Sequence, residues 1–176
     1  MRTLITGGVR SGKSFHAESL VVAAPDVTYI APGPAPDPEF DPDWAARVEA
    51  HRSRRPAHWK TVETADLERA IAMTDDTVII DCLGTWVTAL VSELDGWDQT
   101  LDDWEPEFWL RVERAAQAMA AHGEDVVVVT NEVGWGVVPE HRSGRLFRDL
   151  LGKVNQRFAM DCDEVLLVVA GRVLRL

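Results

Sequence analysis

A chain of 176 residues with 46% hydrophobic and 27% charged residues has the composition of an ordinary globular protein, and its length fits one domain over residues 1–176. The formal net charge of −11 argues against a general nucleic-acid binder or a protein held on anionic membranes, because both need a broad cationic surface. The chain has no apolar run near the roughly 20 residues that cross a bilayer, and no cleavable leader, so the sequence predicts a cytoplasmic protein.

Short apolar runs alternate with helical segments along most of the chain. In the first half of the chain we expect a strand at 2–6, a helix at 13–24, a strand at 27–31 and a loop rich in proline and acid at 32–44. The end of this loop overlaps a helix at 42–53, which Asp41 caps, and a helix at 66–73 follows. In the second half we expect a strand at 77–83, a helix at 105–122, a strand at 126–130, a helix at 139–160 and a final run at 164–176. The tryptophan-rich segment 97–107 is expected to cap the fourth of these helices at the surface, although an interface or core role is equally open.

The runs "TVIID" and "VVVV" are almost wholly apolar, which is typical of strands buried on both faces of a parallel sheet. The predicted fold is therefore α/β and P-loop NTPase-like, with a mainly parallel sheet and helices on both faces. A C-terminal antiparallel hairpin can turn at Gly171. In such folds, ligands bind beyond the carboxyl ends of the strands. Cys82 and Cys162 each lie in an apolar run and are expected to be buried thiols without chemistry.

A phosphate-binding loop is predicted between the first strand and the first helix. Gly7, Gly12, Lys13 and Ser14 fit the pattern G-x-x-x-x-G-K-[ST] in the context that this motif requires. Backbone N–H groups of such a loop point at phosphate oxygens, while Lys13 reaches the outer phosphates and Ser14 can bind Mg²⁺. Asp81 closes a neighbouring buried strand and is the candidate second anchor for the metal, the alternative being an ordinary helix cap.

Residues 44–60, called here the cationic segment, carry positive charge in an acidic protein. The segment holds five cations and one acid, a local balance of +4, which are Arg47, Arg52, Arg54, Arg55 and Lys60 against Glu49. Arginine forks bind phosphate oxygens bidentately, so the segment indicates a focused anion site. The alternative is a solvated helix face whose cations pair with surface acids.

His51 is the candidate nucleophile. It follows Arg47 by four residues, so on a helix both side chains project from one face. A neutral imidazole can attack the α-phosphorus of a nucleoside triphosphate, while nearby arginines stabilise the developing charge. An ordinary surface histidine is the alternative. We interpret His58 as packing against Trp59, and His16, His122 and His141 as structural.

Several motifs together resemble one family across nearly the whole chain. They are "GGVRSGKS", "YIA", "RVEAHRSRRPAHWKTVE", "DCLGTWVTAL", "TNEVGWGVVPE" and "FRDLLGKVNQRFA". In this order they resemble the bifunctional adenosylcobinamide kinase and adenosylcobinamide-phosphate guanylyltransferase family of cobalamin biosynthesis. The resemblance implies phosphorylation of adenosylcobinamide with ATP or GTP, then transfer of GMP from GTP through a guanylylated histidine, which falls on His51. It also implies a homotrimer.

The resemblance implies a nucleotide-binding set and a metal pair. The nucleotide contacts fall on Gly7, Gly8, Val9, Arg10, Ser11, Gly12, Lys13, Ser14, Ala31, Pro32, Gly33, Arg52, Ser53, Arg54, Arg55, Glu63 and Asp81. Mg²⁺ would lie on Ser14 and Asp81. The chain departs from the family where Pro32 and Gly33 follow "YIA", where Asp81 replaces a usual Glu, and in a longer loop at 32–44.

Two other functions remain open at this point. One is a kinase of a different small alcohol, in which the cationic segment only binds phosphate. The other is a nucleotide sensor without group transfer. Glu132, directly beyond the strand 126–130, is a further candidate for contacting substrate or accepting a hydroxyl proton.

Overall fold

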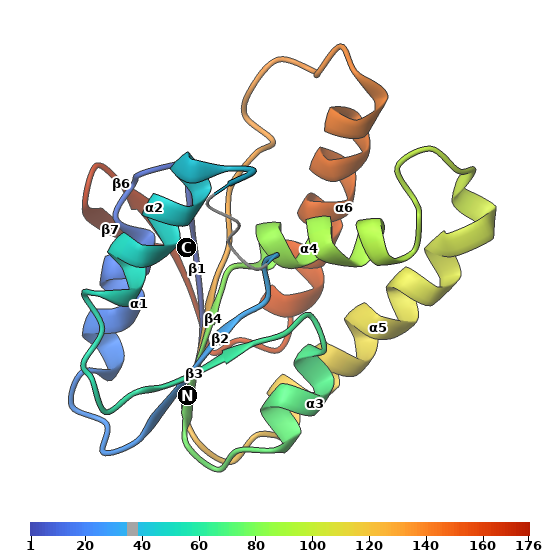
Figure 1. The fold of residues 1–176 in the computed structure, drawn as a ribbon. Helices are drawn as coiled ribbons and strands as arrows, with labels where there is room; N and C mark the ends of the chain where they lie inside the picture. Colours follow the sequence, from blue (N-terminus) through green and yellow to red (C-terminus); the bar gives the residue numbers. More distant parts are fainter. Residues whose placement is uncertain (35–38) are drawn as a thin grey trace.

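The protein is built on one sheet with the strand order β3-β2-β4-β5-β1-β6-β7 (Figure 1). The structure, a computed structural model, describes residues 1–34 and 39–176, and only the backbone of Trp44 and Arg47. The strands are β1 (Arg2–Gly7), β2 (Val27–Ala31), β3 (Lys60–Glu63), β4 (Thr77–Asp81), β5 (Val126–Val129), β6 (Glu164–Val169) and β7 (Arg172–Arg175). The helices are α1 (Lys13–Val21), α2 (Pro42–Arg52), α3 (Leu67–Ala72), α4 (Leu83–Glu93), α5 (Leu101–Ala121) and α6 (Arg142–Ala159).

The sheet is parallel from β3 to β6 and ends in an antiparallel β6–β7 pair, as the sequence predicts. The hairpin turns at Ala170 and Gly171, whose φ angles of 49° and 74° are the left-handed values that a two-residue turn of type I′ requires. All four residues of β5 are buried, because helices cover both sides of the central strands.

Two cores lie on opposite faces of the sheet. Along β2, Ile30 belongs to the larger core, which α3, α4, α5 and α6 cover, while Tyr29 belongs to the smaller core beside α1. Leu4 and Ile5 divide between the same two cores on β1. This alternation follows from the two-residue period of a strand. Figure 1 shows α1 and α2 on one side of the sheet and the remaining helices on the other. The prediction of helices on both faces is confirmed.

The segment after β4 differs from the prediction. The expected strand 77–83 ends at Asp81, and the apolar run that follows is helix α4, which the sequence reading left without an element. The Thr85 hydroxyl donates to the Cys82 carbonyl at 2.9 Å in the first turn of this helix. A short apolar run cannot be assigned to strand or helix by periodicity alone, because a strand or a helix that is buried on every side shows no alternation of apolar and polar residues. The edge strand β3 was likewise not predicted.

The helix boundaries differ from the predictions at both ends, and α1 ends at Val21 rather than at residue 24. α5 begins at Leu101 rather than at residue 105 and contains Pro106, and α6 begins at Arg142 rather than at 139. α2 begins at Pro42 as expected, with the Ala45 amide donating to the Asp41 carbonyl. Residues 35–38 of the expected loop 32–44 lie outside the described residues.

The tryptophan-rich segment packs inward. Trp104 is 2% exposed and meets Phe108 edge to face, with 5.9 Å between the ring centroids. Trp97 and Trp109 are half-buried and pack against the same core, so the tryptophans take the alternative core role and not that of a surface cap. Among the described residues, no helix is long and apolar enough to span a membrane.

Candidate active site

The loop that joins β1 to α1 is folded for close approach by its backbone. A side chain at Gly7 would place its Cβ 2.4 Å from the Val168 carbonyl oxygen, so only glycine fits. Gly12 has a φ of 99°, a left-handed value that glycine adopts without strain. The Gly171 amide donates to the Ser11 carbonyl at 2.8 Å, so the β6–β7 turn braces the loop from behind. A glycine loop that leads directly into a helix N-terminus is the arrangement in which backbone N–H groups can bind phosphate oxygens.

Lys13 lies at the mouth of this loop. Its side chain is 7% exposed, and its Nζ donates to the Gly8 carbonyl at 3.1 Å. A buried ammonium is stable only with partners, and phosphate oxygens can replace a carbonyl oxygen in that role. The position fits the predicted contact with the outer phosphates.

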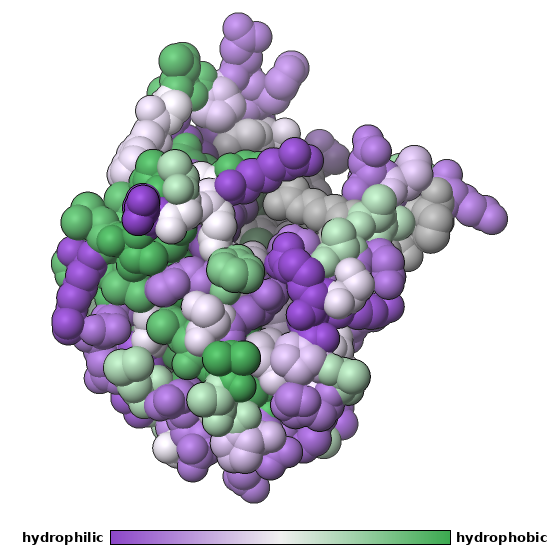
Figure 2. All heavy atoms as spheres, turned by 90° about the vertical axis from the view of Figure 1, so that its left-hand side faces the viewer, coloured by the Kyte–Doolittle hydropathy of each residue, from purple (hydrophilic) through white to green (hydrophobic). Residues whose placement is uncertain are grey.

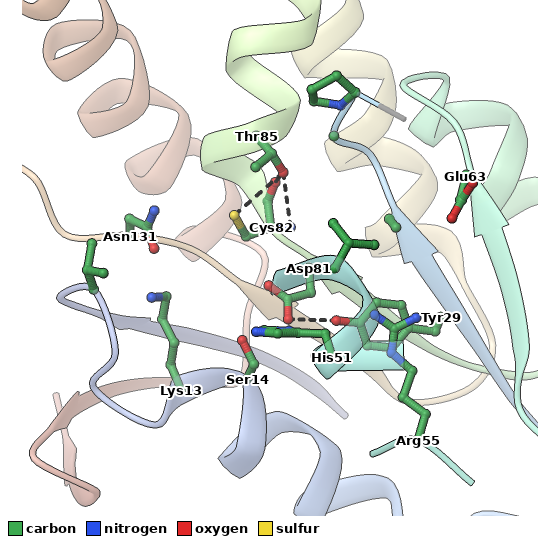
Figure 3. Close-up of a pocket in the computed structure, with 15 residues that line it drawn as sticks. Lys13, Ser14, Tyr29, His51, Arg55, Glu63, Asp81, Cys82, Thr85 and Asn131 are labelled. Atoms are coloured by element: carbon green, nitrogen blue, oxygen red, sulfur yellow. Dashed lines mark hydrogen bonds between the residues drawn. The ribbon is translucent and has the colours of Figure 1, made fainter. Parts of the chain in front are cut away.

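One pocket beyond the carboxyl ends of β2 and β4 is lined by half of the predicted residues (Figure 3). Those lining it are Val9, Lys13, Ser14, Ala31, Gly33, His51, Arg55, Glu63 and Asp81. In Figure 3 the side chains of Lys13, Ser14, His51 and Asp81 converge on one side of the pocket, and Glu63 lies on the opposite side. The four convergent groups come from α1, α2 and β4, so only the tertiary fold unites them.

A second pocket adjoins the first and lies between the phosphate-binding loop and α2. It shares Lys13, Ser14 and His51 with the first pocket and adds the predicted residues Arg10, Ser11, Gly12 and Arg54. His51 therefore stands where the two pockets meet. Its side chain is half-buried, which suits a nucleophile that is reached by a bound substrate.

Five of the predicted nucleotide contacts line neither pocket among the described residues. They are Gly7, Gly8, Pro32, Arg52 and Ser53. Gly7 and Gly8 still shape the loop, and the Gly8 carbonyl holds Lys13. The Ser53 hydroxyl donates to the Ala50 carbonyl at 3.3 Å, within its own helix turn.

The cationic segment is partly neutralised by nearby acids. Arg52 pairs with Glu63, and Arg54 pairs with Glu18 of α1 at 3.2 Å. Lys60 pairs with Asp76 at 2.8 Å, and neither residue lines the pockets beside the phosphate-binding loop. The alternative of cations paired with surface acids is therefore realised for these three residues, whereas Arg55 faces the pocket. The expected shared face of Arg47 and His51 lies outside the described side chains.

Tyr29 is a pocket residue that sequence reasoning missed. Its hydroxyl donates to Asp81 Oδ2 at 2.7 Å, and the Arg55 guanidinium carbon lies 3.3 Å above its ring centroid. Burial, reinforced by the Asp81 carboxylate, raises the pKa of Tyr29 well above its usual value, so the hydroxyl keeps its proton and acts as a donor. The available signal was that the chain's single tyrosine lies in the predicted strand 27–31.

The segment that follows β5 contributes Asn131 rather than Glu132 to the pocket. Glu132 Oε1 accepts the Gly134 amide at 2.5 Å, and the Glu132 amide donates to the Gly7 carbonyl at 3.1 Å. Glu132 therefore shapes the turn after β5, and its expected role toward substrate gains no support. Cys82, Thr85 and Asn131 are further lining residues that were not predicted.

The two cysteines are free and half-buried, somewhat more accessible than expected. Burial raises the pKa of Cys82, and burial also raises the pKa of Cys162 to about 12. The thiols are therefore protonated at neutral pH and poor nucleophiles. His122 is structural as predicted, since its Nε2 lies 2.8 Å from the Asp76 carbonyl oxygen.

Comparison with known proteins identifies the family of this chain. The family described as cobinamide kinase / cobinamide phosphate guanyltransferase matches residues 3–176. The bifunctional adenosylcobalamin biosynthesis protein CobU of Salmonella typhimurium strain LT2 is 44% identical, and that of Escherichia coli strain K12 is 42% identical, each over 97% of both chains. The corresponding protein CobP of Pseudomonas aeruginosa is 36% identical over 97% of this chain and 94% of its own.

A solved structure shows the breadth of the fold. An ATPase of the type III secretion system of pathogenic bacteria superposes with a TM-score of 0.58 at 9% identity, over 94% of this chain and 50% of that one. This likeness shows a shared P-loop fold and nothing about substrate. The family match over residues 3–176 and the 36–44% identity to three relatives show the family: this chain belongs to the cobinamide kinase / cobinamide phosphate guanyltransferase family.

Proposed function

We propose that this chain phosphorylates the side-chain hydroxyl of adenosylcobinamide with ATP or GTP and then attaches GMP from GTP to the new phosphate, with both transfers made at one site. The activities named for the family support both steps, as do relatives described as bifunctional proteins of adenosylcobalamin biosynthesis. The observation that carries the residue assignment is that Lys13, Ser14, His51 and Asp81 line a single pocket.

In the phosphoryl transfer, the loop N–H groups and Lys13 hold the nucleotide. Lys13 Nζ, which donates to the Gly8 carbonyl, would turn to the outer phosphate oxygens. The substrate hydroxyl attacks the γ-phosphorus and loses its proton, and the nucleoside diphosphate leaves. Ala31 and Gly33 would contact the nucleotide from the end of β2.

The oxygen donors at this end of the pocket fit Mg²⁺. The Ser14 hydroxyl and the Asp81 carboxylate line the same pocket, and Mg²⁺ is usually bound by one or two protein oxygens together with phosphates and waters. Among the described residues, no group of three His, Cys, Asp or Glu side chains could hold a metal alone, which suits an ion shared with the nucleotide. When bound, Mg²⁺ would neutralise charge on the phosphates.

In the guanylyl transfer, His51 is the proposed nucleophile. A neutral ring nitrogen attacks the α-phosphorus of GTP, so that a P–N bond forms as the bond to pyrophosphate breaks. The phosphate of the phosphorylated substrate then attacks the same phosphorus and releases His51. Arg54 and Arg55 line the pockets on either side of His51 and can stabilise the charge that develops on the phosphate oxygens.

Incubation of the full chain with α-³²P-GTP and Mg²⁺ tests this assignment. The expected result is acid-labile, base-stable label on the protein, none on His51→Ala, and unchanged label on His58→Ala, an exposed histidine of the same segment that lines neither pocket. Label that persists on His51→Ala removes His51 from the mechanism. Phosphorylated product without any protein label would indicate a kinase alone, and nucleotide binding without product would indicate a sensor.

We also propose that the chain forms a homotrimer, as the family resemblance implies. Exposed apolar residues on the C-terminal edge strand support an association surface: Val173 is 44% exposed and Leu174 is 58% exposed. The side of the molecule that carries α1, α2 and the β6–β7 end of the sheet faces the reader in Figure 2, where apolar and hydrophilic side chains are mixed. Light scattering should give about three times the chain mass of 19.6 kDa, and a monomer mass at assay concentration would contradict the trimer.

A further inference from the structure

Tyr29 connects two groups of the pocket that come from different parts of the chain. Its hydroxyl donates to Asp81 Oδ2 at 2.7 Å, and its ring lies 3.3 Å beneath the guanidinium carbon of Arg55. In Figure 3 the Arg55 side chain lies across the Tyr29 ring, and the dashed hydrogen bond leads from Tyr29 to Asp81. A single buried side chain thus contacts the candidate metal ligand and a candidate phosphate-binding arginine.

The position of Tyr29 in the sheet explains why it can reach both groups. β2 lies between β3 and β4, and Tyr29 is paired with Thr61 on one side and with Ile79 on the other. Asp81 ends β4, and Arg55 Nη1 donates to the Thr61 hydroxyl at 3.5 Å. The ring itself is 1% exposed, so its orientation is fixed by packing.

One feature of the Arg55 guanidinium group indicates that it is arranged to bind a ligand. Its Nε is buried, and within the described part of the chain it has no hydrogen-bond partner. A buried donor without a partner is uncommon in folded proteins, and it is relieved when an acceptor enters the site. Arg55 lines the pocket that holds Lys13 and His51, where phosphate oxygens are expected.

We propose that Tyr29 is a positioning residue that holds Asp81 and Arg55 at a fixed separation on one wall of the pocket, so that both act on the same nucleotide. The inference rests on the proposed function, because it takes the roles of Asp81 and Arg55 from it. The hydroxyl orients the carboxylate, and the ring orients the guanidinium through a cation–π contact. Packing alone would be served equally by phenylalanine, which lacks the hydroxyl.

Two substitutions separate the two contacts. Tyr29→Phe keeps the ring beneath Arg55 and removes the bond to Asp81, so we expect kcat for phosphoryl transfer to fall about 10–100-fold with little change in nucleotide affinity. Tyr29→Leu also removes the ring, so nucleotide affinity should fall as well. In an Asp81→Asn background, Tyr29→Phe should have no further effect, because the hydroxyl acts through that carboxylate.

The matched control is Thr28→Val in the same strand. Thr28 is 2% exposed, and its hydroxyl donates to Asp76 Oδ2 at 2.7 Å, the same bond length and acceptor type as at Tyr29. Neither Thr28 nor Asp76 lines the pocket. This control should lower thermal stability and leave kcat and KM unchanged. Equal losses of kcat in Tyr29→Phe and Thr28→Val would overturn the proposal, as would a Tyr29→Phe enzyme with normal kcat.

A spectroscopic readout tests the contacts without any turnover. The chain contains a single tyrosine, so labelling with ¹³Cζ-tyrosine gives one resonance. We expect this resonance to shift in Asp81→Asn and in Arg55→Met, and to stay in place in Thr28→Val. An unchanged resonance in both pocket variants would show that Tyr29 contacts neither group. Because this measurement needs no substrate, it stands even if the His51 labelling experiment fails.

Discussion

The phosphate-binding loop and the cationic segment both bring positive charge to the pocket, but they do so in opposite ways. In the loop, the backbone sets the geometry, and of the two charged side chains Lys13 is buried against the Gly8 carbonyl while Arg10 is exposed. In the cationic segment, Arg52 and Arg54 lie at the surface and are paired with Glu63 and Glu18. The backbone of the phosphate-binding loop is therefore already shaped to bind phosphate. Arg52 and Arg54 of the cationic segment, in contrast, must leave a carboxylate before they can bind a phosphate.

The difference indicates an order of events. Exposed ion pairs contribute only about 0–1 kcal/mol, so a phosphate already anchored in the loop can draw an arginine away from its carboxylate. The loop would therefore bind the triphosphate first, and the arginines beside His51 would follow. This arrangement keeps Arg52 and Arg54 neutralised until a nucleotide is present.

The largest effect is expected from breaking the backbone geometry of the loop. In Gly7→Ala, the new Cβ would lie 2.4 Å from the Val168 carbonyl oxygen and 2.8 Å from the Ser11 hydroxyl, so the loop has to move. A displacement near 1 Å can cost about 100-fold in rate, and we expect a loss of that size in phosphoryl transfer. The measurement is kcat/KM for kinase activity alongside thermal unfolding.

Gly123→Ala is the control for that substitution, because a Cβ there meets no atom within 4 Å. It should leave both activities unchanged. Normal kinetics in Gly7→Ala would contradict the view that the backbone fixes the phosphate-binding loop, since the loop would then accommodate an added side chain.

A smaller effect is expected from releasing an arginine. Glu18→Gln removes the carboxylate that pairs with Arg54 at 3.2 Å, so Arg54 no longer has to exchange partners. Since such a pair is worth about 0.2–1 kcal/mol, GTP affinity should rise by about 1.4- to 5-fold. Fluorescent nucleotide titration measures this change. A fall in affinity would mean instead that Glu18 positions Arg54 for the nucleotide.

A smaller effect again is expected at an ion pair remote from the pocket. Arg157 of α6 donates to Glu113 of α5, and these hydrogen bonds, with one from Gln117, lower the pKa of Glu113 to about 2. The folded pKa lies below the ordinary value near 4.5, so the stabilisation is complete above pH 4.5 and is lost as the pH falls toward 2.

Glu113→Gln should therefore flatten the loss of stability between pH about 4.5 and about 2, and lower the melting temperature at pH 7 by no more than about 4 °C. Calorimetry across that range measures both. Nucleotide affinity should not change, in contrast to Glu18→Gln. Identical acid slopes in the two proteins would show that this pair contributes nothing.

The smallest effect is expected from thiol reagents. With a pKa of about 12, Cys162 is a thiolate in roughly one molecule in 10,000 at pH 8, and burial also raises the pKa of Cys82. Ellman's reagent should label neither thiol within minutes until denaturant is added. Cys82 lines the pocket, so its rapid labelling would show that the pocket wall around Cys82 opens more readily than the phosphate-binding loop does.

The parts of the site that were predicted are those encoded in consecutive residues. The loop from Gly7 to Ser14 is specified by a local pattern, because its glycines decide the path of the backbone. His51 and Asp81 were proposed from their positions on a helix and at a strand end. Tyr29 and Asn131 were missed, because a single tyrosine within a strand and an asparagine just after one are not enough to mark a pocket residue.

The amino-acid sequence by itself determined the P-loop, the parallel sheet and the final hairpin, since each follows from short-range spacing of glycine, apolar and charged residues. Only the tertiary structure decided that α2 places His51 beside Lys13, that Arg52 and Arg54 pair with acids, and that Tyr29 joins Asp81 to Arg55. The physical reason is that these contacts join residues far apart in the chain, whose proximity depends on how the helices pack against the sheet.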